Sequence, residues 1–206
     1  MTQPSTVVVF DLGGVVVDWD PVPAIAVEVG LARARAFLDG DHFDWAAWNH
    51  AQDAGRPWAE AEASAVAAHP QLAQEITAYR RNYPLSLRGL VPGTSEIMRA
   101  LHARGIRLVA LTNWSAETFP HATGAWPEVF ALFDDIVVSG EEGIAKPDPA
   151  IFAVLAARLG ADLDGIPYID DSPANLAAGA RAGLDAIRFV DAEDLGRELR
   201  VRGLLP

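Results

Sequence analysis

The chain has 206 residues, half of them hydrophobic, which is enough for one full domain and a smaller inserted unit. Its 28 acidic and 16 basic side chains give a formal net charge of -12, so nucleic acid and anionic membrane surfaces are not expected as partners. There is no cysteine, which excludes disulfides and thiolate metal sites. Without a signal-peptide pattern or a long apolar run, we expect a cytoplasmic protein.

The first predicted element is a strand over residues 6–10. This run, TVVVF, is rich in β-branched residues and apolar throughout, which is typical of a strand buried on both faces of a parallel sheet. It leads directly to Asp11. Gly13 and Gly14 follow and would allow the backbone to approach a bound ligand closely.

Residues 18–86 have a different character. Strand-like runs disappear, and alanine-rich stretches at 58–69 and 71–83 favour helices. Because one strand precedes this segment and the other strands follow it, we predict a helical cap domain over residues 18–86. The core domain would then consist of residues 1–17 and 87–206.

From about residue 88 onward, predicted strands and helices alternate. Strands are expected at residues 107–111, 136–138 and 166–169, with an edge strand at 186–190. Helices are expected at residues 94–104, 148–159 and 172–183, each bounded by capping residues, proline or glycine. This alternation predicts an α/β fold with a doubly wound, Rossmann-like parallel sheet and an inserted helical cap.

Polar residues follow the predicted strands at the points where they end. In an open parallel sheet, the ligand site lies beyond the carboxyl ends of the strands, so these residues would share one crevice. Each alone is better explained as a turn former, a loop or helix cap or, for Lys146, a surface charge. Together they place a nucleophile, a hydroxyl, a cation and an acidic pair at one edge. The residues are Asp11, Thr112, Asn113, Lys146, Asp170 and Asp171.

The same residues lie in four ordered motifs. They read VVFDLGGV at 8–15, LTN at 111–113, KPDP at 146–149 and YIDDSPAN at 168–175. This ordered set resembles the haloacid-dehalogenase-like hydrolases over residues 7–190. The predicted insert is similar to the helical cap of the first cap class in that family, and other segments are similar to its haloacid-dehalogenase and sugar-phosphate phosphatase branches.

The resemblance implies a Mg2+-dependent phosphomonoester hydrolase acting on a small phosphorylated metabolite, with a sugar phosphate favoured. Asp11 would attack phosphorus and form an aspartyl-phosphate, assisted by Thr112 and Lys146. The resemblance assigns Mg2+ to Asp11, the Gly13 carbonyl, Asp171 and Asp170. It assigns the phosphate to Thr112, Lys146 and the backbone N–H groups of Leu12, Gly13 and Asn113. A monomer or a homodimer is expected.

The sequence departs from the common phosphatase pattern at Gly13. Many family members carry there a second aspartate that serves as general acid and base. The enzyme could instead use esters with good leaving groups, such as sugar 1-phosphates. Alternatively, Asp18, Asp20 or Asp53 could supply the proton, although each is also explained as a helix cap or surface charge.

Two other functions remain open at this stage. The haloacid dehalogenases use an equivalent aspartate without a metal and also lack the second aspartate, but they carry neutral residues where Asp170 and Asp171 stand here. Without a divalent cation, these carboxylates would repel Asp11 and an anionic haloacid. The chain could also be a non-catalytic module that binds a phosphorylated ligand, although its catalytic positions other than Gly13 are intact.

Specificity is expected to come from the cap. The candidates that could face the crevice are Trp19, Trp45, Trp48, Asn49 and Arg56, with packing inside the cap as an equally good explanation for the tryptophans. Trp114 directly follows Asn113 and is predicted to form a wall of the substrate pocket.

Overall fold

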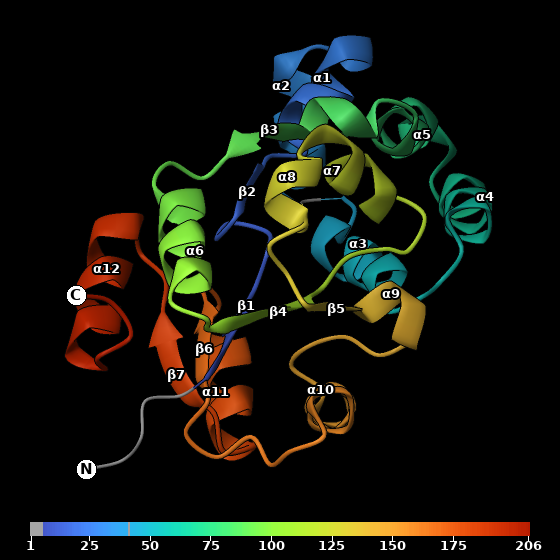
Figure 1. The fold of residues 1–206 in the computed structure, drawn as a ribbon. Helices are drawn as coiled ribbons and strands as arrows, with labels where there is room; N and C mark the ends of the chain where they lie inside the picture. The colour runs from blue at the N-terminus through green and yellow to red at the C-terminus, as the bar shows by residue number, and fades with distance from the viewer. Residues whose placement is uncertain (1–5, 41) are drawn as a thin grey trace.

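The centre of the computed structural model, which describes residues 6–40 and 42–206, is a five-stranded parallel sheet in the order β5-β4-β1-β6-β7 (Figure 1). The strands are β1 (Val7–Phe10), β4 (Arg107–Thr112), β5 (Asp135–Val138), β6 (Pro167–Asp170) and β7 (Asp185–Arg188). This confirms the predicted doubly wound α/β fold, with β7 at an edge. β7 ends earlier than predicted because its partner β6 ends at Asp170, which pairs with Arg188.

Side chains of the central strands alternate between two buried clusters, one on each face of the sheet. In β1, Val8 and Phe10 join one cluster and Val9 joins the other, and all three are fully buried. In β4, Leu108 and Leu111 likewise belong to opposite clusters. Successive side chains of a strand point to opposite faces of the sheet. Because both faces are buried, these strands appear in the sequence as continuous apolar runs.

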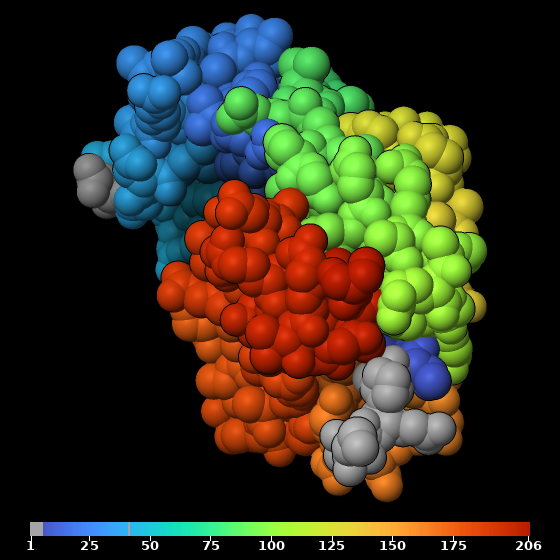
Figure 2. All heavy atoms as spheres, turned by 60° about the vertical axis from the view of Figure 1, so that its left-hand side comes forward, coloured from blue at the N-terminus to red at the C-terminus, as the bar shows by residue number. Residues whose placement is uncertain are grey.

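Helices cover both faces of the sheet. The main ones are α6 (Thr94–Ala103), α10 (Pro149–Leu159), α11 (Pro173–Arg181) and α12 (Ala192–Val201). α10 and α11 contribute to the cluster that contains Val9, whereas α6 and α12 contribute to the other. Figure 2 shows α12 in red beside α6 in green, below the blue helices of the insert. The short helices α7 (Phe119–Ala125), α8 (Pro127–Phe130) and α9 (Ser139–Glu142) lie in connections where no helix was predicted.

The predicted helical insert is present and lies beyond the carboxyl end of β1 (Figure 1). Its helices are α1 (Val22–Val29), α2 (Leu31–Leu38), α3 (Trp45–Asp53), α4 (Trp58–Ala68) and α5 (Ala73–Arg81). Two short 3-10 turns, η1 (Pro70–Leu72) and η2 (Tyr83–Ser86), flank α5. The division into two domains at residues 17/18 and 86/87 stays a prediction.

An antiparallel pair of strands, which the sequence did not predict, joins the insert to the core. β2 (Val17–Trp19) pairs with β3 (Leu87–Leu90), and the register shifts between Asp18 and Trp19. Each strand is very short and mixes polar residues or glycine with apolar ones, so neither shows a clear alternation. None of the helices in the described parts of the chain is long and apolar enough to cross a membrane.

Candidate active site

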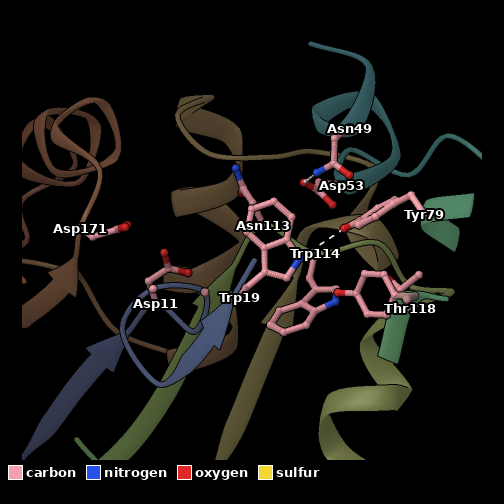
Figure 3. Close-up of a pocket in the computed structure, with 12 residues that line it drawn as sticks. Asp11, Trp19, Asn49, Asp53, Tyr79, Asn113, Trp114, Thr118 and Asp171 are labelled. Atoms are coloured by element: carbon pink, nitrogen blue, oxygen red, sulfur yellow. Dashed lines mark hydrogen bonds between the residues drawn. The ribbon is translucent and has the colours of Figure 1, made fainter. Parts of the chain in front are cut away.

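A cavity of about 300 Å³ lies where the carboxyl end of the sheet meets the insert (Figure 3). Core residues Asp11, Gly13, Gly14, Asn113 and Asp171 line it from the sheet. The other lining residues come from β2, the insert and the loop after β4; they are Trp19, Asn49, Asp53, Tyr79, Tyr83, Trp114 and Thr118. This volume is at the small end for ligand pockets and suits a phosphoryl group with a small leaving group.

Three carboxylates meet at the sheet end of the cavity. An oxygen of each of Asp11, Asp170 and Asp171 lies within 4.8 Å of the others. Asp11 follows β1 and Asp170 ends β6, and these strands are parallel neighbours, so the sheet itself brings the two residues together. Carboxylates at this separation repel one another, and their hard oxygen atoms are the ligands that Mg2+ prefers.

Lys146 is fully buried behind these carboxylates. Its Nζ lies 3.0 Å from Asp11 Oδ1 and 2.7 Å from Asp170 Oδ2, and it donates to the Leu111 carbonyl at 2.7 Å. Burial lowers the pKa of Lys146, but the charges of Asp11 and Asp170 outweigh burial and raise the pKa above its usual value. Lys146 is therefore a fixed cation beside Asp11.

One lysine does not neutralise the cluster. Burial raises the pKa of Asp11 to about 7; Lys146 opposes this rise, and the charge of Asp170 adds to it. Burial and the charge of Asp170 also raise the pKa of Asp171. A divalent cation among the carboxylates would supply the missing positive charge and favour their ionised forms.

Asp170 is held in place from several sides. Its Oδ1 accepts a hydrogen bond from the Ser172 backbone N–H at 2.8 Å, and Asn175 Nδ2 lies 3.2 Å from each of its two carboxylate oxygens. The Tyr168 hydroxyl donates to Oδ2, which also accepts from Lys146. Asp170 thus orients Lys146 and the start of the following helix while it faces the cluster.

The two glycines after Asp11 have different structural roles. Gly14 has a φ of 75°, which favours glycine, and a Cβ at this position would lie 2.6 Å from Asp171 Oδ2, so that the Asp171 side chain would have to move. At Gly13, by contrast, an added Cβ would meet no atom within 4 Å. The aspartate found there in many related phosphatases is therefore not excluded by space.

Three residues after β1 and at the end of β4 supply further polar groups to this edge of the sheet. In the parts of the chain that the structure describes, the buried Thr112 hydroxyl has no hydrogen-bond partner. Asn113 accepts from the Lys146 backbone N–H and donates to the Lys146 carbonyl, both at 2.8 Å, and so fixes the lysine loop. The Leu12 N–H donates to Asp11 Oδ1 at 2.7 Å. Asn113 lines the cavity, whereas Thr112, which ends the strand next to β1, is not among the lining residues.

Ser139 joins the insert to the core beside the pocket. Its hydroxyl accepts a hydrogen bond from the Trp114 backbone N–H at 2.9 Å and donates to the Asp53 carbonyl at the end of α3. Trp58 adds a second link, because its indole N–H donates to the Ser115 hydroxyl at 2.9 Å. These contacts hold α3 over the carboxyl end of the sheet.

Residues 6–183 match the family described as haloacid dehalogenase-like hydrolase. The chain belongs to this family of hydrolases. The match spans most of the chain and includes all four motifs that carried the resemblance, so the predicted family membership is confirmed.

Two relatives of this hydrolase are phosphatases. The phosphoglycolate phosphatase of Rhodospirillum rubrum is 33% identical over 130 residues, which make up 61% of this chain and 52% of that protein. The (DL)-glycerol-3-phosphatase 1 of Arabidopsis thaliana is 25% identical over 202 residues, or 91% of this chain and 64% of that protein. The chain thus spans between half and two thirds of the length of these relatives.

A solved structure shares the fold of this hydrolase. The HAD family enzyme bt-2542 from Bacteroides thetaiotaomicron, in its magnesium complex, is 19% identical and superposes with a TM-score of 0.73. The superposition covers 96% of this chain and 100% of that one.

Some of the residues that could face the crevice line the pocket, and others do not. Trp19 and Asn49, two of the cap candidates, and Trp114 are among the lining residues, and their contact with a substrate stays a prediction. Trp45 and Trp48 are buried with ring centroids 5.4 Å apart and pack in the aromatic core of the insert, which was the alternative explanation. Arg56 donates to Gln52 and to the Trp48 carbonyl and is not among the lining residues.

Of the three acidic residues considered as substitute proton donors, Asp53 lines the pocket, whereas Asp18 and Asp20 pair with Arg88 outside it. The sequence analysis missed Tyr79, Tyr83 and Thr118. Tyr79 and Tyr83 lie four residues apart, a spacing that would place both on one face of a continuous helix, although Tyr83 in fact follows the end of α5. That spacing was the available signal, but it does not tell whether the face meets the pocket or the core of the insert.

Proposed function

We propose that this hydrolase is a Mg2+-dependent phosphatase of small phosphomonoesters, with a sugar phosphate as the favoured substrate, and that Asp11 is its nucleophile. The cluster of Asp11, Asp170 and Asp171 around buried Lys146 carries the proposal, because such a cluster is stable in ionised form only with a further cation.

The residues that would hold Mg2+ are Asp11, Asp170, Asp171 and the carbonyl of Gly13. When bound, the ion neutralises negative charge on the carboxylates and on the phosphate. Two unit charges of the same sign repel by roughly 4 kcal/mol at 4 Å near a protein surface, so a carboxylate cannot approach a phosphate without such compensation.

The proposed reaction has two displacement steps. An Asp11 carboxylate oxygen forms a bond to phosphorus while the ester P–O bond breaks, and the leaving oxygen takes up a proton from water and departs as the alcohol. Water then attacks phosphorus, the bond to Asp11 breaks, and inorganic phosphate is released. Lys146, the Thr112 hydroxyl and the backbone N–H groups of Leu12, Gly13 and Asn113 would stabilise charge on the transferring group.

Haloacid dehalogenation is less well supported by the same site. The acidic pair Asp170 and Asp171 would repel an anionic haloacid, and Gly13 and Gly14 place no aromatic ring beside Asp11. Release of halide from a 2-haloacid without metal would support the dehalogenase instead.

The test is a phosphatase screen over sugar phosphates and p-nitrophenyl phosphate with Mg2+ and with a chelator, repeated on Asp11→Asn. We expect turnover that depends on Mg2+ and falls at least a thousandfold in the variant. Unchanged turnover in Asp11→Asn would remove Asp11 from its role. Ligand binding by the unmodified protein without turnover of any ester would favour a non-catalytic binding module.

A further inference from the structure

Asp53 lies at the end of the pocket formed by the insert. Figure 3 shows it beside Asn49 and Tyr79, on the side of the pocket opposite Asp11 and Asp171. Its Oδ2 accepts a hydrogen bond from Asn49 Nδ2 at 3.0 Å. The position points to contact with the leaving group of a substrate whose phosphate sits at the sheet end.

In the described parts of the chain, no cationic side chain forms an ion pair with Asp53. The described lining of the pocket contains no lysine, arginine or histidine. Arg56, three residues further along the chain, is bound to Gln52 and the Trp48 carbonyl, and Arg80 of α5 pairs with Glu62 and Glu117. Burial raises the pKa of Asp53 to about 7, with partial opposition from the Ser115 backbone N–H. An ionised Asp53 therefore lacks the positive partner that buried carboxylates normally have.

Aromatic rings form most of the remaining wall. Trp19, Tyr79, Tyr83 and Trp114 line the same pocket, and the Trp19 indole N–H donates to the Tyr79 hydroxyl at 3.3 Å. The face of an aromatic ring attracts a cation, most strongly where water is excluded. A lone carboxylate within an aromatic wall is an arrangement that binds a positively charged ligand group.

The same arrangement discriminates between leaving groups. A carboxylate or a second phosphate would face Asp53 without any cation to receive it. A neutral hydroxyl could donate to Asp53 but would leave its charge uncompensated. A protonated amine would satisfy both the carboxylate and the rings.

We propose that this end of the pocket is a leaving-group subsite for a protonated amine, held by Asp53 within the rings of Trp19, Tyr79, Tyr83 and Trp114. The inference rests on the proposed phosphatase function and narrows its substrate to phosphate esters of amino alcohols or amino sugars. The cavity of about 300 Å³ accommodates a phosphate with such a group, and an amino sugar phosphate also satisfies the sugar-phosphate proposal. Asp53 is then a specificity-determining residue.

The test uses two series of esters whose leaving groups differ in charge. Phosphoethanolamine, 2-hydroxyethyl phosphate and phosphoglycolate form one series; glucosamine 6-phosphate, glucose 6-phosphate and 6-phosphogluconate form a second. In at least one series we expect kcat/KM for the amine to exceed that for the neutral ester at least tenfold, with the carboxylate lowest. Equal or higher kcat/KM for the neutral ester in both series would overturn the subsite.

The variant Asp53→Asn keeps the shape of the side chain and removes its charge. We expect kcat/KM for the amine to fall at least tenfold, mainly through KM, and kcat/KM for the neutral ester to change less than threefold. Asp18→Asn, which removes an acid outside the pocket, should leave both values unchanged. If Asp53→Asn instead lowers kcat for every ester except p-nitrophenyl phosphate, whose leaving group needs no proton, Asp53 is a proton donor and the subsite proposal is wrong.

A binding measurement separates the subsite from the chemistry. The measurement uses Asp11→Asn with Mg2+ and the series in which the amine ester had the higher kcat/KM. Calorimetry should give a Kd for the amine ester at least tenfold lower than for the neutral ester of that series. Adding Asp53→Asn to Asp11→Asn should remove this difference in Kd. Equal Kd values would overturn the subsite. Turnover of p-nitrophenyl phosphate reports on the proposed function alone, so the two proposals can fail independently.

Discussion

The two ends of the pocket differ in how their charges are compensated. At the sheet end, Asp11 and Asp170 share the buried Lys146, and oxygens of Asp11, Asp170 and Asp171 lie close enough for one ion to contact all three. At the other end, Asp53 stands among aromatic rings, with hydrogen bonds from the Asn49 amide and the Ser115 backbone N–H but no ion pair in the described parts of the chain. This difference is expected if the sheet end binds an ion and a phosphate, as we propose, and the insert end binds a positively charged group of the substrate.

Removing the cation at the sheet end should have the largest effect. Lys146→Met keeps the length of the side chain but leaves Asp11 and Asp170 without their shared partner. We expect stability to fall by about 3–5 kcal/mol and kcat to fall roughly a hundredfold or more. Chemical denaturation and steady-state kinetics with Mg2+ measure the two effects. Full activity in a folded variant would show that Lys146 plays no part in the reaction.

Removing the charge at the insert end should stabilise the protein at neutral pH. The pKa of Asp53 rises from 3.8 to about 7 on folding, so between these pH values the folded protein holds a proton that the unfolded chain has lost. The contribution of Asp53 to stability therefore falls as the pH rises from about 4 to 7. Asp53→Asn abolishes this fall and should gain up to about 4 kcal/mol over the unmodified protein by pH 7.

Denaturation midpoints between pH 4 and 8 measure that gain. Tyr79 and Tyr83, which line the same pocket, keep their protons throughout this range, because burial raises the pKa of both. The exposed Asp162→Asn serves as a control and should not alter the pH dependence of stability. A constant difference between Asp53→Asn and the unmodified protein at every pH would contradict the prediction.

A methyl group at Gly14 should damage the sheet end moderately. Gly14→Ala puts a Cβ against Asp171 and forces alanine into a left-handed backbone conformation, which costs about 1–2 kcal/mol. We expect the Mg2+ concentration for half-maximal activity to rise roughly tenfold because Asp171 must move. Gly203→Ala also has a positive φ, but its Cβ would meet no atom within 4 Å, so it controls for backbone strain alone. An equal effect of both variants on Mg2+ dependence would exclude the contact with Asp171 as the cause.

An acid introduced at the sheet end should produce the smallest change. Gly13→Asp restores the residue that many related phosphatases carry, at a position where a Cβ meets nothing within 4 Å. We expect kcat for alkyl phosphates to rise about tenfold, since a general acid assists a poor leaving group, with little change for p-nitrophenyl phosphate. Gly13→Asn is the matched control without the acid. A similar increase in both variants would mean that proton donation is not responsible.

The sheet end could be predicted from the sequence, and the insert end largely could not. Asp11 and Asp170 directly follow or end apolar strands, and parallel pairing places such residues at one edge whatever the rest of the chain does. Asp53, Tyr79 and Tyr83 lie in helical segments of the insert. The position of these segments over the sheet depends on the β2–β3 pair and on the Ser139 contacts. Neither the strand pair nor these contacts produce a periodic pattern in the sequence. Trp19 and Trp45 show what the sequence cannot predict. Trp19 lines the pocket and Trp45 packs inside the insert, but nothing in the composition around them distinguishes the two.

The hydroxyl of Ser139 has a kinetic consequence. It is the shared partner of the Trp114 N–H and the Asp53 carbonyl, so moving α3 away from the sheet exchanges one good hydrogen bond for contact with water. The net free energy of such a bond is only about 1 kcal/mol. The Trp58 indole makes a second such bond to Ser115, so both bonds would have to break if the insert moved away from the sheet. We expect the two bonds together to contribute little to the barrier for such a movement.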